Sequence, residues 1–405
     1  MNKIHVYLFA FLLFASPNIV SFIGGDYIMV QAFVLAIGMF LIVKRWPALK
    51  EEGILKTFLL FLALFAVYKL MTDVGAGTRQ SVVQIIGAPI LLLAYSLPEH
   101  CFESYKNQRI GNSLVRIFLT FYLVETILAI IERLLMTNVF GWNAMGHVIL
   151  IPRTAEFRSA SLIGHPLYNS LVVSIAMAFI LTSPMKLKYK FSLWSLGFLS
   201  VMCFNTRAAM VLDALLLAAY LIYFVWSHRS SYLGNKTKTL MYSVLIFSAG
   251  ALCVFKFNFG GRLLKMGLMD DGSAQVRVDA WSVLSYLDYG KLLFGYTDNE
   301  ISYLLHRAGL WTTENFWIDQ CLKFGLIFFA IYILFYLFII RNLLKGYFSF
   351  QKVFLLSAFI GCASVNNSLS WNFFALFEFL FLLVVFNPNV VYNFFPRKYV
   401  LKEYE

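Results

Sequence analysis

Charged residues are scarce in this chain. Asp, Glu, Lys and Arg make up 13% of its 405 residues, whereas soluble domains carry about 25%. Hydrophobic residues account for 60%, and the mean hydropathy of +0.74 is typical of a chain surrounded largely by lipid. This composition excludes a soluble enzyme, an intrinsically disordered protein and a small secreted domain stapled by disulfides.

Sequence signatures of metal and nucleotide sites are also missing. The five cysteines form no C-x-x-C pair, the six histidines show no H-x-x-H or H-E-x-x-H spacing, and there is no Walker loop. We therefore expect neither a metal nor another cofactor. The net charge of +12 does not imply nucleic acid as a partner, because the cytoplasmic loops of membrane proteins collect Lys and Arg and lipid phosphates are anionic ligands.

Long apolar stretches are what the sequence has in abundance. About twelve of them approach the 17–25 residues that a membrane-spanning helix needs, and the alternation typical of a β-barrel is not seen. We predict an all-α integral membrane protein with about 12 transmembrane helices. Residues 1–259 would hold nine spans with a shorter external loop at 136–164, residues 260–315 a large, partly helical loop, and residues 316–405 three spans and a tail.

The basic residues alternate between loops. With the N-terminus placed inside, the inside segments hold about 19 Lys and Arg in roughly 70 residues, and the outside segments hold about nine in roughly 105. The positive-inside rule then places both termini in the cytoplasm. The long polar loop at 260–315 falls on the external side, and the chemistry is expected there because the internal loops are short.

Three ionisable residues are candidates at the external membrane face. Arg207 lies between two long apolar spans with almost no connecting loop. A guanidinium there is costly unless it is paired or hydrated, so Arg207 is interpreted as a snorkelling interface residue or an anion ligand. Arg158 and His165 flank a short segment before Pro166, which suits the first turn of a helix. His165 is either a structural residue or a sugar-binding residue or base.

The large loop contains further candidates. Residues 274–288 have the spacing of a helix that ends at Gly290. Arg277 in its first turn opposes the helix dipole, which makes sense if an anion binds there, although an ordinary surface Arg is the alternative. Arg262 in the same loop is a candidate for substrate binding.

The end of the loop combines an acid and an amide. Glu314 and Asn315 directly precede the tenth predicted span. Glu314 is interpreted as a general base whose pKa is tuned by burial, or as an acid that favours the start of a helix. Asp319 and Lys323 are four residues apart in the favourable order, which predicts an ion pair within one helix.

Several ionisable residues lie inside predicted spans. Such residues are costly in lipid and usually face the interior of a bundle. The sequence does not pair them; they are Lys69, Glu125, Glu132, Arg133, Asp213 and Glu378.

The end of the large loop resembles a signature of bacterial O-antigen polymerases (Wzy-type) and O-antigen ligases. That superfamily has His, then Asn, Ser or Gln, nine residues, Gly, two residues, and Gly, Thr or Tyr. Here Glu314 and Asn315 are followed by nine residues, Gly325, two residues and Phe328. The Asn, the spacing and the Gly match, whereas the first and last positions depart.

Three more segments are similar to that superfamily in the same order along the chain. The stretch from Arg158 to His165 resembles its arginine-to-GHP segment, and Arg207 occupies the place of the arginine at its hairpin tip. Arg277, followed by Trp281, resembles the arginine of its periplasmic-loop helix.

The resemblance implies a glycosyltransferase of the bacterial inner membrane with a periplasmic active site. It would polymerise a surface polysaccharide (O-antigen, capsule or exopolysaccharide) from undecaprenyl-diphosphate-linked oligosaccharide, with inversion and without metal. Glu314 would be the base, Arg207 and Arg277 would hold the diphosphate, and Arg158, His165, Asn315 and Arg262 would bind substrate.

Partners, besides the lipid bilayer, would be a chain-length regulator and a flippase. One alternative is a ligase that moves the glycan to lipid A core, although Glu in place of His at position 314 favours the polymerase. An alternative from another class is a lipid or solute transporter, for which comparable halves would be expected. A structural scaffold would leave the external arginines unexplained.

Overall fold

The structure is a computed structural model. It describes residues 10–45 except 12 and 26, 108–140, 150–151, 156–227, 279–310, 313, 315–364 and 373–387, together with isolated positions and short runs between 60 and 71 and between 237 and 261. Arg262, Arg277 and Glu314 lie outside the described residues, as do parts of several predicted spans.

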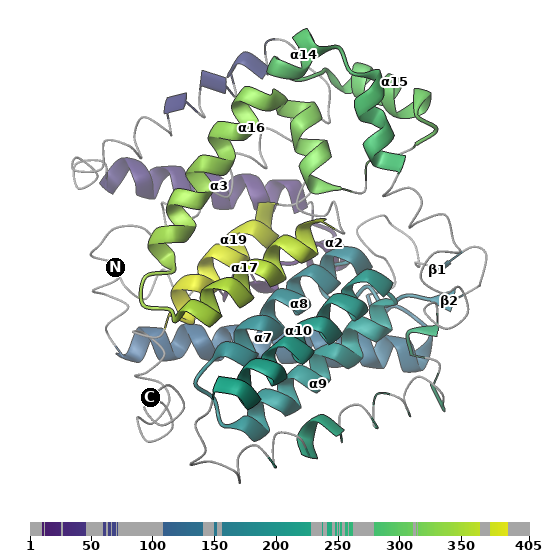
Figure 1. Cartoon of the computed structure of the whole chain (residues 1–405), viewed down its shortest axis with the longest axis vertical. Coiled ribbons are helices and arrows are strands. Elements are labelled where there is room, and N and C mark those ends of the chain that lie inside the picture. Colours follow the sequence, from purple (N-terminus) through teal and green to yellow (C-terminus); the bar gives the residue numbers. More distant parts are fainter. Residues whose placement is uncertain are drawn as a thin grey trace.

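The described part of the chain is almost entirely helical (Figure 1). Two residues each form the antiparallel strands β1 and β2, in which Leu150 pairs with Phe157. The elements in chain order are α2 (Pro17–Phe22), α3 (Tyr27–Arg45), α7 (Gln108–Leu135), β1 (Leu150–Ile151), β2 (Glu156–Phe157), α8 (Pro166–Thr182), α9 (Leu187–Phe204), α10 (Arg207–Ser227), the 3₁₀ helix η3 (Ala280–Tyr286), α14 (Tyr289–Phe294), α15 (Asp298–Arg307), α16 (Phe316–Leu343), α17 (Ser349–Ser364) and α19 (Phe373–Val385).

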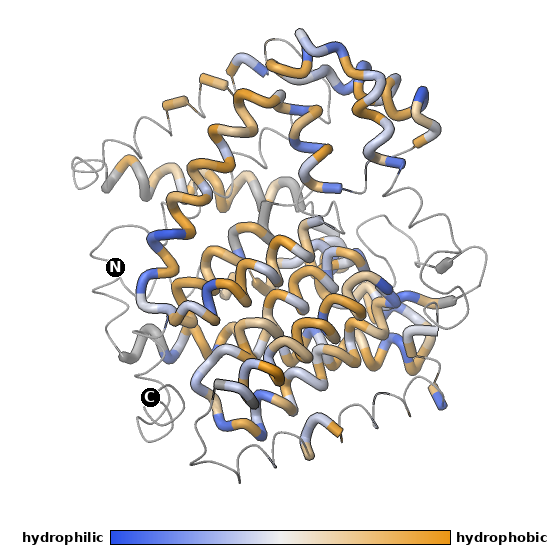
Figure 2. Tube along the Cα trace, viewed as in Figure 1, coloured by the Kyte–Doolittle hydropathy of each residue, from blue (hydrophilic) through white to orange (hydrophobic). Residues whose placement is uncertain are grey.

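Three of the described helices are long and apolar enough to cross a membrane: Asn112–Leu135 in α7, Arg207–Phe224 in α10, and α16. The first has 24 residues, which is about 36 Å of helix against a hydrocarbon core of about 30 Å. Helices α8 and α17 are shorter apolar helices. The all-α, membrane-spanning class thus agrees with the structure. Figure 2 shows hydrophobic residues along these helices and hydrophilic ones mainly near helix ends and around α14 and α15.

Helix α8 is the centre of the bundle. Every residue of α8 except Leu167 is buried, and α7, α9, α10, α17 and α19 pack around it. Pro166 is its first residue, as predicted, because a proline at this position lacks only an N–H that would have no partner within the helix.

Hydrogen bonds show which helix ends lie together at one end of the bundle. Gln351 Nε2 donates to the carbonyl of Thr182 (2.8 Å), and Asn387 Nδ2 donates to the carbonyl of Leu343 (3.4 Å). The end of α8, the start of α17 and the ends of α16 and α19 therefore lie together. We call this the basic end, because it carries Lys186, Lys188, Arg341, Lys345 and Lys352.

The opposite end, here called the arginine end, holds the starts of α8 and α10. Trp317 Nε1 donates to Ser364 Oγ (2.9 Å), so the beginning of α16 and the end of α17 lie at this end as well. The N–H of Gly260 donates to the carbonyl of Met202 near the end of α9 (3.1 Å). The polar segment that begins at 260 therefore leaves the bundle at the arginine end.

Helix α16 is not the straight span that its apolar sequence predicts. Gly325 has φ 77° and ψ 163° inside it, and Figure 1 shows two limbs that meet at a sharp bend. A side chain at Gly325 would collide with α14, because its Cβ would lie 2.5 Å from the amide nitrogen of Gly295, itself at φ +85°. Two glycines are required here because the backbones touch and both have left-handed φ values.

The predicted helix from 274 to Gly290 is wrong in its second half. Of its described residues, those in η3 form a 3₁₀ helix that ends at Tyr286, and Leu287 is extended. The Asp288 side chain accepts the N–H of Gly290 (2.9 Å) and starts α14. Asp is a favourable cap, so Gly290 lies in the first turn of a new helix and does not end the earlier one. We call η3, α14 and α15 the outer layer.

Candidate functional site at the arginine end

The turn between α9 and α10 holds Arg207 at the end of the bundle. Asn205 ends α9 in the left-handed conformation (φ 57°, ψ 45°), which Asn tolerates better than most residues. Arg207 follows as the first residue of α10 and is 7% exposed. The hairpin tip predicted from the sequence is therefore correct, and the guanidinium is buried there.

A buried carboxylate shapes the segment that carries Arg158 and His165. Glu132, near the end of α7, is 0% exposed. Its Oε2 accepts the backbone N–H groups of Ala160 (2.8 Å) and Ser161 (2.9 Å). Two successive N–H groups can point at one oxygen because the chain bends at Ser161, which has φ 47°. The bend costs backbone strain, which these charge-assisted hydrogen bonds offset.

A second carboxylate, Glu125, lies about two turns earlier in α7 and also holds this segment. Glu125 Oε2 accepts the N–H of Leu162 (3.1 Å), and Ser161 Oγ donates to the Glu125 carbonyl (2.8 Å). Ser159 Oγ donates to the carbonyl of Ala129 (2.7 Å). The segment 159–162 is thus held along the last turns of α7 by side chains that the sequence could not pair.

Arg158 joins this segment to the α9–α10 turn. Its Nε donates to the carbonyl of Phe204 (3.0 Å), the last residue of α9, and the N–H of Ser159 donates to the carbonyl of Cys203 (3.2 Å). A cation favours the end of a helix, where carbonyl groups have no partner within the helix. Arg207 lies three positions after Phe204, so the structure brings two predicted arginines to one place.

His165 completes this group as a neutral side chain. It precedes α8, and its side chain forms no capping hydrogen bond. Burial, and secondarily the charge of Arg158, lowers the pKa of His165 from 6.5 to about 4. His165 is therefore uncharged near pH 7 and suited to hydrogen bonding with a sugar. A pKa this low makes it a weak base.

Asn315 has a structural role at the start of α16. Its Oδ1 accepts the N–H groups of Trp317 (3.0 Å) and Ile318 (3.2 Å), which caps the helix. Lys323 and Asp319 form the predicted ion pair (2.8 Å). The Asn and Gly of the polymerase-like signature thus mark a helix start and a helix bend.

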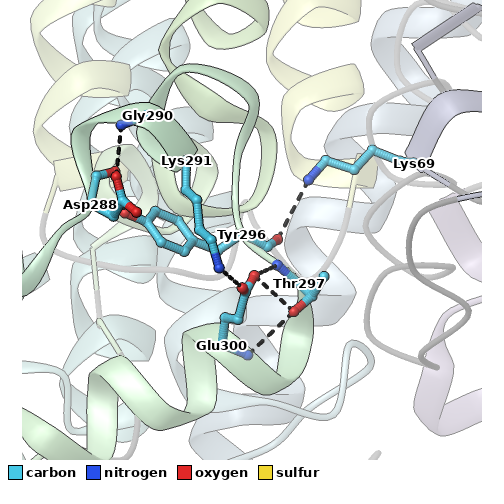
Figure 3. Close-up of polar contacts among 7 residues, drawn as sticks. All are labelled: Lys69, Asp288, Gly290, Lys291, Tyr296, Thr297 and Glu300. Carbon is cyan, nitrogen blue, oxygen red and sulfur yellow. Dashed lines mark hydrogen bonds and ion pairs between the residues drawn. The ribbon is translucent and has the colours of Figure 1, made fainter.

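Sequence reasoning missed a polar group in the outer layer (Figure 3). Glu300 accepts the N–H of Thr297 (2.9 Å), and it forms an ion pair with Lys291. The hydrogen bond from Lys291 lowers the pKa of the Glu300 carboxyl. Lys69, one of the ionisable residues inside the predicted spans, donates to the carbonyl of Tyr296 (3.4 Å). The sequence signal for the cap is the Thr-x-x-Glu spacing, which is typical of a helix start.

In the part of the chain that the structure describes, no three His, Cys, Asp or Glu side chains gather closely enough to hold a metal ion. No family model, curated protein or solved structure matches this chain.

Proposed function

We propose that the chain is a membrane glycosyltransferase that polymerises a surface polysaccharide such as O-antigen, capsule or exopolysaccharide. It transfers a growing glycan from undecaprenyl diphosphate to the non-reducing end of a new lipid-linked repeat unit. The observation that carries the proposal is the hydrogen bond from Arg158 to the carbonyl of Phe204, three positions before Arg207, at one end of an apolar bundle. Guanidinium groups match the geometry of phosphate oxygens.

The charge distribution supports the orientation required. The five basic residues of the basic end favour the cytoplasmic side of a bacterial inner membrane. The arginine end then faces the periplasm, where the lipid-linked substrates are found. A lipid-linked diphosphate at this surface would keep its isoprenoid chain in the bilayer while its headgroup reaches the arginines.

Each candidate side chain has one role in the proposed reaction. Glu314 takes the proton of the acceptor hydroxyl, whose oxygen attacks the anomeric carbon of the donor and inverts it. The bond from that carbon to the diphosphate oxygen breaks, and the electron pair leaves with the lipid diphosphate. Arg207, Arg277 and Arg158 stabilise the charge that develops on the leaving group.

The remaining candidates position the sugars. His165, neutral near pH 7, hydrogen-bonds to a sugar hydroxyl, and Arg262 contacts the substrate from the large loop. Asn315 positions α16 through its cap and contacts the sugar through its amide group. Because the donor is already activated by its diphosphate, the reaction requires neither nucleotide nor metal.

The test is polymer formation by purified protein in vesicles supplied with lipid-linked repeat units. Arg207→Lys keeps the positive charge but loses the planar guanidinium, which can donate hydrogen bonds to two phosphate oxygens at once. We therefore expect strong loss of polymer at normal protein levels. Arg341→Lys, at the basic end, is the matched control and should retain activity. Glu314→Gln should lower the rate by roughly 10²–10⁴-fold, the usual contribution of a general base.

The same assay can reject the proposal. Wild-type polymer from Arg207→Lys would remove the diphosphate-clamp role of that residue. Transfer only to lipid A core, without chain growth, would identify the ligase, because the two reactions differ only in the acceptor.

A further inference from the structure

The outer layer exposes large apolar side chains. Trp281 is 58% exposed, Tyr289 82% and Phe294 56%, and the 14 residues from 281 to 294 also expose Leu284, Tyr286 and Leu293. So many exposed large apolar side chains within one short stretch are unusual on a surface that faces water. The outer layer has a separate buried core, formed by residues that include Ala280, Val283, Ile301 and Leu304, so these exposed side chains are not needed to hold it together.

Helix α14 is fixed against the bend of α16. The N–H of Tyr296 donates to the carbonyl of Leu322 (2.8 Å), and Gly295 contacts Gly325 backbone to backbone. The backbone of Phe294 therefore lies close to Gly325, and Leu326, the next residue of α16, is 42% exposed at the start of the long limb. The apolar surface of α14 continues that of a helix able to span the membrane.

Helix length decides the depth at which α14 lies. Arg341 is exposed at the basic end of α16 and lies sixteen positions after Gly325, which is about 24 Å of helix. The hydrocarbon core is about 30 Å thick, and any tilt of the helix shortens the rise across it. With Arg341 at one boundary of the core, Gly325 and the adjoining α14 lie at or within the other boundary, whichever side of the membrane that is.

We propose that the exposed face of η3 and α14 lies in the bilayer interface, with the side chains of Trp281, Tyr289 and Phe294 among the lipids. Trp and Tyr favour this region because their rings are apolar at one end and polar at the other. The adjoining Lys291 carries its charge at the level of the headgroups. This inference does not depend on the proposed reaction.

A glycan is the other occupant that aromatic side chains could bind. Leu284, Leu293 and Phe294 offer a sugar no polar group, and the continuity with Leu326 leads into lipid. The observations therefore favour the bilayer, and glycan binding becomes one result that would overturn the proposal.

The experiment measures depth with a nitroxide label on the full chain in lipid vesicles, in a background without the native cysteines. Tyr289→Cys carries the label on α14, and Asn299→Cys, exposed on α15, is the matched control. Collisions with oxygen, which concentrates in lipid, should exceed those with a water-soluble nickel chelate at 289. The opposite order is expected at 299.

A second measurement does not depend on labelling. Vesicles whose lipids carry bromine near the headgroup should quench the fluorescence of wild-type protein more than that of Trp281→Phe. Equal nickel access at 289 and 299, or equal quenching of the two proteins, would overturn the proposal. Protection of 289 by a soluble oligosaccharide in detergent, without protection in vesicles, would overturn it in favour of a glycan platform.

Discussion

Replacing Glu132 with Gln should loosen the segment 157–165. Oε2 of Glu132 accepts the N–H groups of Ala160 (2.8 Å) and Ser161 (2.9 Å), and Oε1 accepts the N–H of Val139 (3.0 Å). Both carboxylate oxygens are therefore used. Gln has one acceptor oxygen, so its NH₂ group faces either the two buried N–H groups of Ala160 and Ser161 or the partly buried N–H of Val139.

The cost follows from these hydrogen bonds. A hydrogen bond to a charged group contributes about 1.5–3 kcal/mol, and a buried donor left without an acceptor costs about 1–3 kcal/mol. Loss of one such contact, with weakening of the others, gives a destabilisation of about 2–4 kcal/mol. The effect should be concentrated in the segment that Glu132 holds, because its other neighbours keep their contacts.

Glu125→Gln on the same helix is the matched control. Among the described residues, Glu125 uses only Oε2 in a side-chain hydrogen bond, to the N–H of Leu162 (3.1 Å), and Oε1 has no hydrogen-bond partner there. One amide oxygen can replace that contact. We therefore expect the segment 157–165 to be loosened less than in Glu132→Gln.

Amide hydrogen exchange of the peptide covering 157–165 reports the difference. At 1.4 kcal/mol per factor of ten, exchange in Glu132→Gln should be at least about ten-fold faster than in wild type, and the increase in Glu125→Gln should be smaller. Equal exchange in the two variants would show that the carboxylate at 132 does not hold the segment, and the reasoning about the arginine end would fail.

Three further predictions concern the bend, pH and orientation. Gly325→Ala should lower the free energy of unfolding by about 2–4 kcal/mol, because the new side chain would be strained at a left-handed φ and would overpack the contact. Its Cβ would lie 2.5 Å from backbone atoms of the outer layer. Gly290→Ala is the control in the same thermal-unfolding assay and should cost much less, because the nearest atom to its Cβ would be 3.4 Å away. The folded-state pKa of His165 is lowered to about 4, so the unfolded chain binds more protons between about pH 4 and 6.5 and stability should rise with pH across that window. His165→Asn should flatten this part of the pH–stability curve, and an unchanged slope would contradict the assignment. A reporter active only outside the cytoplasm should work when fused near Gly272 and be silent near Gly234; the reverse pattern would overturn the proposed orientation.

Local features of the site could be predicted from the sequence. Pro166 starts α8, Asn205 and Arg207 form a tight turn, and Asp319 pairs with Lys323. Each prediction depends on residues within one or two helical turns, for which spacing along the chain determines distance in space. The helix predicted to end at Gly290 failed because the capping side chain of Asp288 starts a new helix two residues earlier in the chain.

The bend of α16 shows where such reasoning stops. Gly325 interrupts a run of apolar residues that is long enough to span a membrane. A glycine inside an apolar run does not by itself end a helix. The bend depends on the contact with Gly295, thirty positions earlier, and that contact exists only after the outer layer has packed on α16.

The membrane-spanning, helical class of this protein follows from short stretches of its sequence. Apolar stretches, the scarcity of charge and the placement of basic residues are properties of short windows, and they specify helices that cross a membrane whatever their neighbours are. Tertiary structure decided which buried charges meet. Glu132 reaches N–H groups 28 and 29 residues away, and Lys69 reaches a carbonyl 227 residues away. These partners depend on which faces of the helices pack together. In the low dielectric of the interior each such hydrogen bond is strong, so these contacts fix the positions of the arginine end and the outer layer.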